Sequence, residues 1–109
     1  MRRNLQLLRA RKLFEQASPQ LVAFGDIQRQ HIVLLLCENG PMSVSQITAG
    51  SQLSRPAISH HLKILQDANL VRVTRIGTRH EYALHLREGT ECLNELLKVM
   101  SDFWKGEGR

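Results

Sequence analysis

Residues 53–84 constrain the fold of this 109-residue chain more than any other segment. The segment starts with Ser54, which can cap a helix, and continues through an amphipathic stretch. It then changes to the alternating pattern of two short strands, with Gly77-Thr78 at the position of a tight turn. A helix followed at once by a hairpin predicts a small structural unit with one exposed helical face.

Residues 54–68 separate into two faces on a helix of 3.6 residues per turn. Ile58, Leu62 and Leu65 share one face, which we expect in the core. The opposite face carries the polar side chains Ser59, His60 and Lys63, with Arg55 at its N-terminal edge. His61 borders the apolar face, so we expect it to be hydrogen-bonded at the edge of the core.

A second, shorter helix is predicted before this one. Ser43 and Gln46 have the spacing of a capping box, and a glycine-containing turn follows at residues 50–52. Two helices joined by such a turn form a helix-turn-helix, here residues 43–68. With a hairpin over 70–84, strands near 70–75 and 79–84, the pattern predicts one mainly α-helical domain with a small β-hairpin wing, a winged helix-turn-helix.

The N-terminal residues 1–25 are predicted to hold two helices, 3–17 and 19–24. The boundary between them is predicted at Ser18-Pro19, because serine can cap a helix and proline fits a first helical turn. A central helix is expected over residues 27–38, since Asp26 can cap it and Asn39-Gly40-Pro41 stops it. Its run of five apolar residues, 32–36, predicts a position inside the domain.

The last helix is expected over residues 88–105. Its apolar residues recur at helical spacing, and no surface within so small a domain is left to cover them. The stripe therefore predicts a subunit interface. The expected interface residues of this helix are Leu93, Leu96, Leu97, Met100, Phe103 and Trp104.

Basic charge is concentrated in two places, although the chain as a whole carries only +5. Residues 1–17 and residues 53–80 each hold five basic residues against one acidic residue, whereas from residue 81 onward acidic residues outnumber basic ones. An ordinary solvated surface would explain the excess of basic residues, but not their concentration in these two segments. The pattern favours a protein that binds duplex DNA through residues 53–80.

Within that segment the residues divide by expected role. The N-terminal part of a reading helix enters the major groove, so Arg55, Ser59 and His60 are candidates for contacts with base edges. Ser54 and Lys63 are candidates for phosphate contacts. In the wing, Arg75, Thr78 and Arg79 are expected to reach the DNA backbone or a minor groove; the alternative is an ordinary solubilising hairpin.

The chain resembles the ArsR-type (arsenical-resistance repressor) winged-helix regulators over nearly its whole length. The most specific match is the run S-R-P-A-I-S-H-H-L-K-I-L at residues 54–65, supported by residues 24–29, 43–47, 68–71 and 75–82. One departure is Ile27, where the family often has proline. The resemblance implies a homodimer, joined through its first and last helices, that binds a palindromic operator until an inducer releases it. Leu7 and Phe14 are the expected contacts on the first helix.

The resemblance also implies where a metal-sensing site would lie. Many members bind metal through a C-x-C pair, but here that site reads Ser43-Val44-Ser45, and hydroxyls are poor ligands for soft metals. A second family site needs a histidine in the last helix, and residues 88–109 contain none. His80 and His85 remain as other candidate ligands. We expect no metal and no cofactor, and the effector stays open.

The two cysteines leave one alternative. Cys37 and Cys92 are expected to be reduced, mostly buried thiols in a cytoplasmic protein. Some relatives form a disulfide between the central and last helices, so a redox-sensing repressor using these two residues is the alternative. An organic effector, a protein partner or no effector at all are the other options.

Composition limits the remaining classes. No run of 18 apolar residues is present, and basic residues interrupt the N-terminal segment, so we expect neither a membrane span nor a signal peptide and place the protein in the cytoplasm. Ser59-His60 lacks a third residue and a pocket, so no enzyme is expected. The expected function is a homodimeric DNA-binding repressor; the rival is a winged-helix module whose basic face binds an acidic protein.

Overall fold

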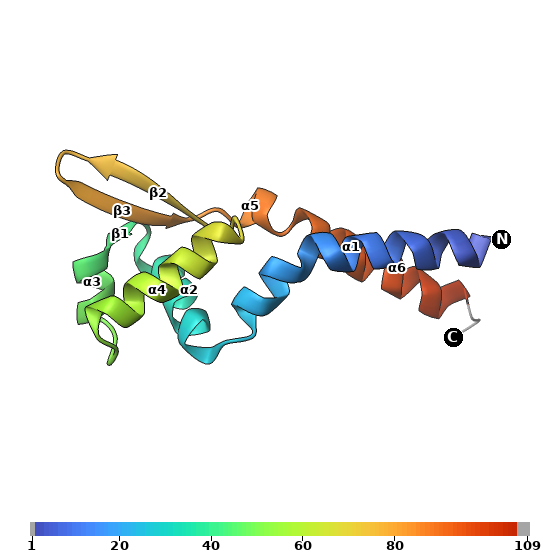
Figure 1. Cartoon of the computed structure of the whole chain (residues 1–109), viewed down its shortest axis with the longest axis horizontal. Coiled ribbons are helices and arrows are strands. Elements are labelled where there is room, and N and C mark those ends of the chain that lie inside the picture. The colour runs from blue at the N-terminus through green and yellow to red at the C-terminus, as the bar shows by residue number, and fades with distance from the viewer. Residues whose placement is uncertain (1, 107–109) are drawn as a thin grey trace.

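The computed structural model describes residues 2–106, apart from the Trp104 side chain. The chain is elongated, with extents of 55 × 26 × 21 Å. Two helices, α1 (Arg2–Phe24) and α6 (Glu91–Gly106), lie antiparallel and form an arm at one end (Figure 1). The remaining elements form a body at the other end, from which a β-hairpin projects (Figure 1).

Helix α1 is continuous, so the prediction of two helices in residues 1–25 is wrong. Pro19 lies inside it and is exposed. Proline removes one helical hydrogen bond, but Ala17, Gln20 and Ala23 are buried on either side of it. Packing of these flanking residues keeps the two halves in line.

Helix α2 (Ile27–Asn39) begins at Asp26, whose carboxylate accepts hydrogen bonds from the backbone N–H groups of Gln28 at 2.8 Å and Arg29 at 3.1 Å. Ile32 and Leu36 are fully buried in the body. The apolar run is not buried throughout, however, because Leu34 points outward and is 59% exposed. Gly40 ends the helix with a φ of 73°, a conformation that favours glycine.

The helix-turn-helix forms as predicted. Helix α3 (Val44–Ala49) starts with the capping box between Ser43 and Gln46, and helix α4 (Arg55–Asp67) starts with the Ser54 side chain accepting from the N–H of Ala57. The predicted inner face of α4 is confirmed, since its three apolar residues are at most 1% exposed. They are Ile58, Leu62 and Leu65.

The wing is the antiparallel pair β2 (Val71–Ile76) and β3 (Arg79–Leu84). Gly77 makes the turn with a φ of 63°. A two-residue strand that the sequence does not predict, β1 (Met42–Ser43), pairs with β3 and gives the order β1-β3-β2. This third strand joins the start of α3 to the wing.

Two apolar clusters hold the molecule together. The larger one lies in the body between α2, α3, α4 and the sheet. The smaller one lies in the arm and consists of Ala10, Leu13, Ala17 and Leu96. Leu96 is 2% exposed, so its assignment to a subunit interface is wrong: α1 of the same chain covers it.

The predicted single helix over 88–105 is divided into α5 (Leu86–Gly89) and α6. Gly89 packs so closely on the Asn69 carbonyl that a Cβ at this position would overlap the carbonyl oxygen. The backbone turns at Thr90, directly after this contact, and α6 then starts at Glu91. This contact joins residues far apart in sequence, which is why helical periodicity does not reveal it.

Candidate nucleic-acid interface

Helix α4 presents one polar face to solvent. Its inner residues fill the core, so the residues between them point away from the body. All five polar residues that the sequence assigns to DNA contact on this helix are exposed. They are Ser54, Arg55, Ser59, His60 and Lys63.

Arg55 is held by a residue of the preceding helix. Its Nη1 donates a hydrogen bond to Ser45 Oγ at 3.0 Å. Ser45 lies in the first turn of α3, and its contribution is not evident from the sequence, because serine in a first helical turn usually serves the backbone.

Two other basic side chains of this surface are paired with carboxylates. Lys63 Nζ lies 3.0 Å from Asp67 Oδ1, one helical turn away, with both side chains more than 60% exposed. On the wing, Arg79 Nη2 lies 3.0 Å from Glu81 Oε2. The exposed Lys63–Asp67 pair contributes little stability, so an incoming phosphate can replace Asp67 at small cost. The Glu81 side chain is only 22% exposed.

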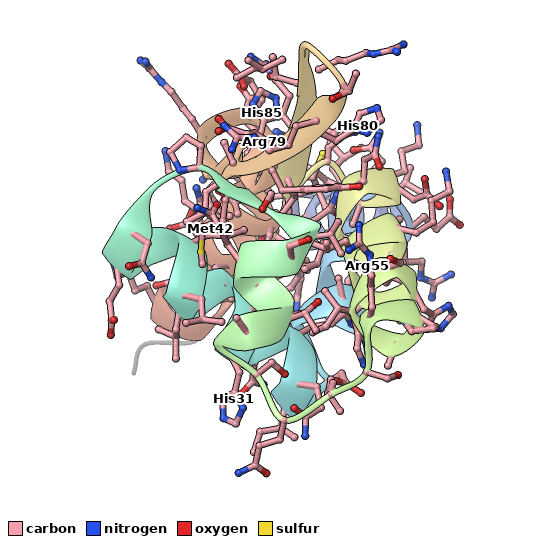
Figure 2. The ribbon with its side chains drawn as sticks, turned by 90° about the vertical axis from the view of Figure 1, so that its left-hand side faces the viewer. His31, Met42, Arg55, Arg79, His80 and His85 are labelled. Atoms are coloured by element: carbon pink, nitrogen blue, oxygen red, sulfur yellow. The ribbon has the colours of Figure 1, made fainter. Side chains whose placement is uncertain are left out.

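The wing tip supplies the other predicted residues. Thr78 is exposed in the turn, and Arg75 donates from Nε to the Gly77 carbonyl at 3.3 Å. Figure 2 looks onto this end of the body, with Arg79 and His80 on the wing side and Arg55 on the helical side.

A cleft of about 390 Å³ lies between the wing and the helix-turn-helix. It brings the two predicted arginines Arg55 and Arg79 to the same depression, and three hydroxyl-bearing residues outside the predicted set also line it. The lining residues are Ser43, Val44, Ser45, Arg55, Thr78, Arg79, His80 and Tyr82. Basic groups and hydroxyls together suit an anion such as a DNA phosphate.

Arg29 anchors the back of α4. It is a buried arginine whose Nε donates to the Ala23 carbonyl at 2.9 Å and whose Nη2 donates to the Val22 carbonyl at 3.2 Å. Its Nη1 lies 3.1 Å from His61 Nδ1, and because arginine has no acceptor, the imidazole accepts. The prediction of a hydrogen-bonded His61 at the core edge is confirmed.

The arm reaches α4 at a second point. The Gln20 side chain of α1 is buried and donates from Nε2 to the carbonyl of Ala68, just after the end of α4. The C-terminal half of α1 is thus linked to α4 at two points: indirectly through Arg29 of α2, which bonds His61, and directly through Gln20 at the end of α4.

The pKa of Asp26 lies below its ordinary value. The main cause is the hydrogen bond from the Arg29 backbone N–H to the carboxylate, with that from Gln28 and the positive charge of Arg29 acting in the same direction. Folding therefore favours the ionised carboxylate of Asp26, which caps the helix that carries Arg29.

The arm leaves a large apolar surface exposed. Among the side chains that the structure describes, eight large apolar residues on these two helices are exposed, including Leu7, Phe14, Leu97 and Met100 of the predicted interface. The other four are Leu5, Leu8, Leu21 and Val22. Leu93 and Phe103 are half-buried, and Phe103 lies 5.9 Å below the Arg3 guanidinium. The predicted contact of Trp104 lies outside the described side chains.

The candidate sensor residues are dispersed. Both cysteines are free thiols, but the prediction that they are mostly buried is wrong: Cys37 is exposed on the face of α2 that points away from the core, and Cys92 is half-buried on α6. The Cys92 Sγ lies 3.6 Å from Gln16 Oε1. His85 is 2.8 Å from Glu88 and 3.3 Å from Arg72. Within residues 2–106, no three His, Cys, Asp or Glu side chains gather as a metal site, and none of the helices there is long and apolar enough to cross a membrane.

The fold and the exposed basic face define a winged helix-turn-helix domain of the DNA-binding class. Residues 26–73 match the family model described as bacterial regulatory protein, arsR family. An uncharacterized HTH-type transcriptional regulator of Methanocaldococcus jannaschii is 42% identical over 89 residues, which cover 82% of this chain and 96% of the relative. This chain belongs to the ArsR family of transcriptional regulators.

Two further relatives agree. An arsenical resistance operon repressor of Bacillus subtilis is 33% identical over 97 residues, covering 89% of this chain and 91% of the relative. The solution structure of a homodimeric winged helix-turn-helix DNA-binding domain from Mycobacterium bovis is 26% identical, with a TM-score of 0.66, and covers 84% of this chain and 82% of the other. The family consists of regulators rather than enzymes.

Proposed function

We propose that this chain is a homodimeric transcriptional repressor that reads a two-fold symmetric DNA site with two copies of α4. The observation that carries the proposal is the outer face of α4, where Arg55, Ser59 and His60 are exposed around the N-terminal half of the helix. The repressor role is taken from the B. subtilis relative. The proposed place of action is the cytoplasm.

In the proposed complex, the N-terminal half of α4 enters the major groove. Arg55 pairs with a guanine, which is worth about 1–3 kcal/mol of discrimination for a bidentate contact. Ser59 and His60 face the neighbouring base edges. Lys63 and the wing residues Arg75, Thr78 and Arg79, together with Ser54, contact phosphates and supply affinity without sequence preference.

The dimer is proposed to form through the arms. The exposed apolar residues of α1 and α6 are of the kind that subunit interfaces bury, and the M. bovis domain is homodimeric. A two-fold axis between the arms places one body on each side, as a palindromic site requires.

Release from DNA is proposed to depend on an effector other than a metal held by thiolates. Ser43 and Ser45 supply only hydroxyls at the start of α3, and Ser43 Oγ already accepts from the Gln46 N–H at 3.2 Å. Hydroxyls bind soft metals poorly.

The test is binding to a duplex selected from a random-sequence library. Arg55→Ala and His60→Ala should each lower the affinity ratio between the selected duplex and a scrambled one by about tenfold, while light scattering still shows a dimer. Lys63→Ala is the control, since it should lower the affinity for the selected and the scrambled duplex by the same factor. An unchanged ratio for Arg55→Ala and His60→Ala contradicts direct reading by α4.

A further inference from the structure

The Arg55 side chain is already oriented in the protein without DNA. It is exposed at the first position of α4, and its partner is Ser45 Oγ at 3.0 Å. The contact crosses from one helix of the helix-turn-helix to the other. Both residues line the cleft below the wing together with Thr78 and Arg79 (Figure 2 labels both arginines).

The partner of Arg55 differs in kind from those of its basic neighbours. Lys63 and Arg79 are paired with carboxylates, which must be displaced before a phosphate can bind. Ser45 is neutral, so the positive charge of Arg55 remains available to DNA. Because the bond uses only Nη1, the edge formed by Nε and Nη2 keeps the two parallel donors that a guanine accepts.

Ser45 is itself firmly placed. The first turn of α3 is closed by the capping box, in which the Ser43 backbone N–H donates to Gln46 Oε1 at 2.9 Å. Behind it, Ile47 is completely buried, as is Ile58 on α4. The hydroxyl therefore has a defined position relative to the start of α4.

We propose that Ser45 is a positioning residue that holds Arg55 in the orientation for reading a base. Arginine has among the largest losses of side-chain freedom on binding, and a hydrogen bond made beforehand reduces that loss. Ser45 thus contributes to sequence discrimination through Arg55 and without contacting the base that Arg55 reads. The inference rests on the proposed function.

The experiment uses the full chain and a duplex selected by the wild-type protein from a random library. The base pair read by Arg55 is identified by substitution: changing it lowers the affinity of the wild-type protein but not that of Arg55→Ala. We expect Ser45→Ala to lower discrimination at that base pair by roughly 3- to 10-fold, the effect of one hydrogen bond. Ser45→Thr, which keeps a hydroxyl, should restore it.

Two comparisons separate positioning from a structural effect. Alanine favours helix formation, so thermal melting of Ser45→Ala should match the wild type. His31→Ala, at an exposed position of α2 outside the proposed DNA and dimer surfaces, should change neither melting nor binding. In the Arg55→Ala background, Ser45→Ala should have no further effect on discrimination.

Two results overturn the proposal while leaving the proposed function intact. In the first, Ser45→Ala keeps the full discrimination at the base pair that Arg55 reads, although Arg55→Ala loses it. In the second, Ser45→Ala lowers this discrimination by the same factor in the wild-type and the Arg55→Ala backgrounds. If the wild-type protein selects no sequence at all, the proposed function itself fails and the inference fails with it.

Discussion

At the scale of single residues, Arg29 links the three helices that set the position of the reading face. It donates to two carbonyls at the end of α1 and to His61 on α4, and it is part of α2. A buried charge is tolerated here because each of its three nitrogens has an acceptor. The same arrangement makes the residue costly to remove.

Arg29→Met should therefore lower the free energy of unfolding by about 2–4 kcal/mol, because it leaves the buried Ala23 carbonyl and His61 Nδ1 without their donor. Urea denaturation measures this loss. Arg87→Met, at an exposed position on α5, is the matched control and should stay within about 0.5 kcal/mol of the wild type. Equal stability of the two variants contradicts the anchoring role.

Asp26 predicts a pH dependence of stability. Its pKa is lower in the folded state than in the unfolded chain, so the stabilisation is complete above the unfolded-state pKa and is lost as the pH falls through the folded-state pKa. Asn is also a good N-cap but does not titrate there. Urea midpoints measured from pH 6 down to pH 2 should fall more steeply for the wild type than for Asp26→Asn; parallel curves contradict the assignment.

At the scale of elements, the arm contains two kinds of apolar residue. Some pack α1 against α6 within one chain, and others are exposed and can contact a second chain. Leu96 is buried against α1, whereas Leu97 is 59% exposed on the adjacent position of α6. The two leucines, next to each other in sequence, should therefore respond differently to the same substitution.

Leu97→Glu should weaken the dimer by more than about tenfold, because a charge enters an apolar interface, while the helical circular dichroism is retained. Leu96→Glu should instead lower the free energy of unfolding by about 3–5 kcal/mol, as expected for a core position. Light scattering and thermal melting distinguish the two effects. A fully dimeric Leu97→Glu variant excludes this face as the interface.

The elements that the sequence predicts correctly are those controlled by local chemistry. The caps at Ser43 and Ser54, the inner face of α4 and the hairpin at Gly77 all depend on residues within a few positions of one another. Continuity through Pro19 and the break at Gly89 depend on packing between distant segments. The Arg55–Ser45 contact is missed for the same reason, since neither residue type specifies a partner ten positions away.

At the scale of the whole molecule, two bodies are joined by their arms in the proposed dimer, and each body presents α4 and a wing. Affinity for DNA then comes largely from phosphate contacts made twice. In such a complex the logarithm of the binding constant falls linearly with the logarithm of salt concentration, by about 0.9 for each phosphate neutralised.

Lys63→Ala should reduce that salt slope by about 2, because one contact is lost from each subunit of the dimer. The loss should be the same for selected and random duplexes. Lys98→Ala, on the arm, is the control and should leave the slope unchanged. A slope that does not change in Lys63→Ala removes this lysine from the phosphate contacts.

The central claim is that a two-fold dimer of this chain reads a DNA sequence, and selection of duplexes from a random library by the wild-type protein tests it most directly. We expect the recovered sequences to converge on an inverted repeat whose half-site centres lie about 10 base pairs, or one helical turn, apart. A recovered pool without an enriched sequence, or one enriched in single half-sites, contradicts it.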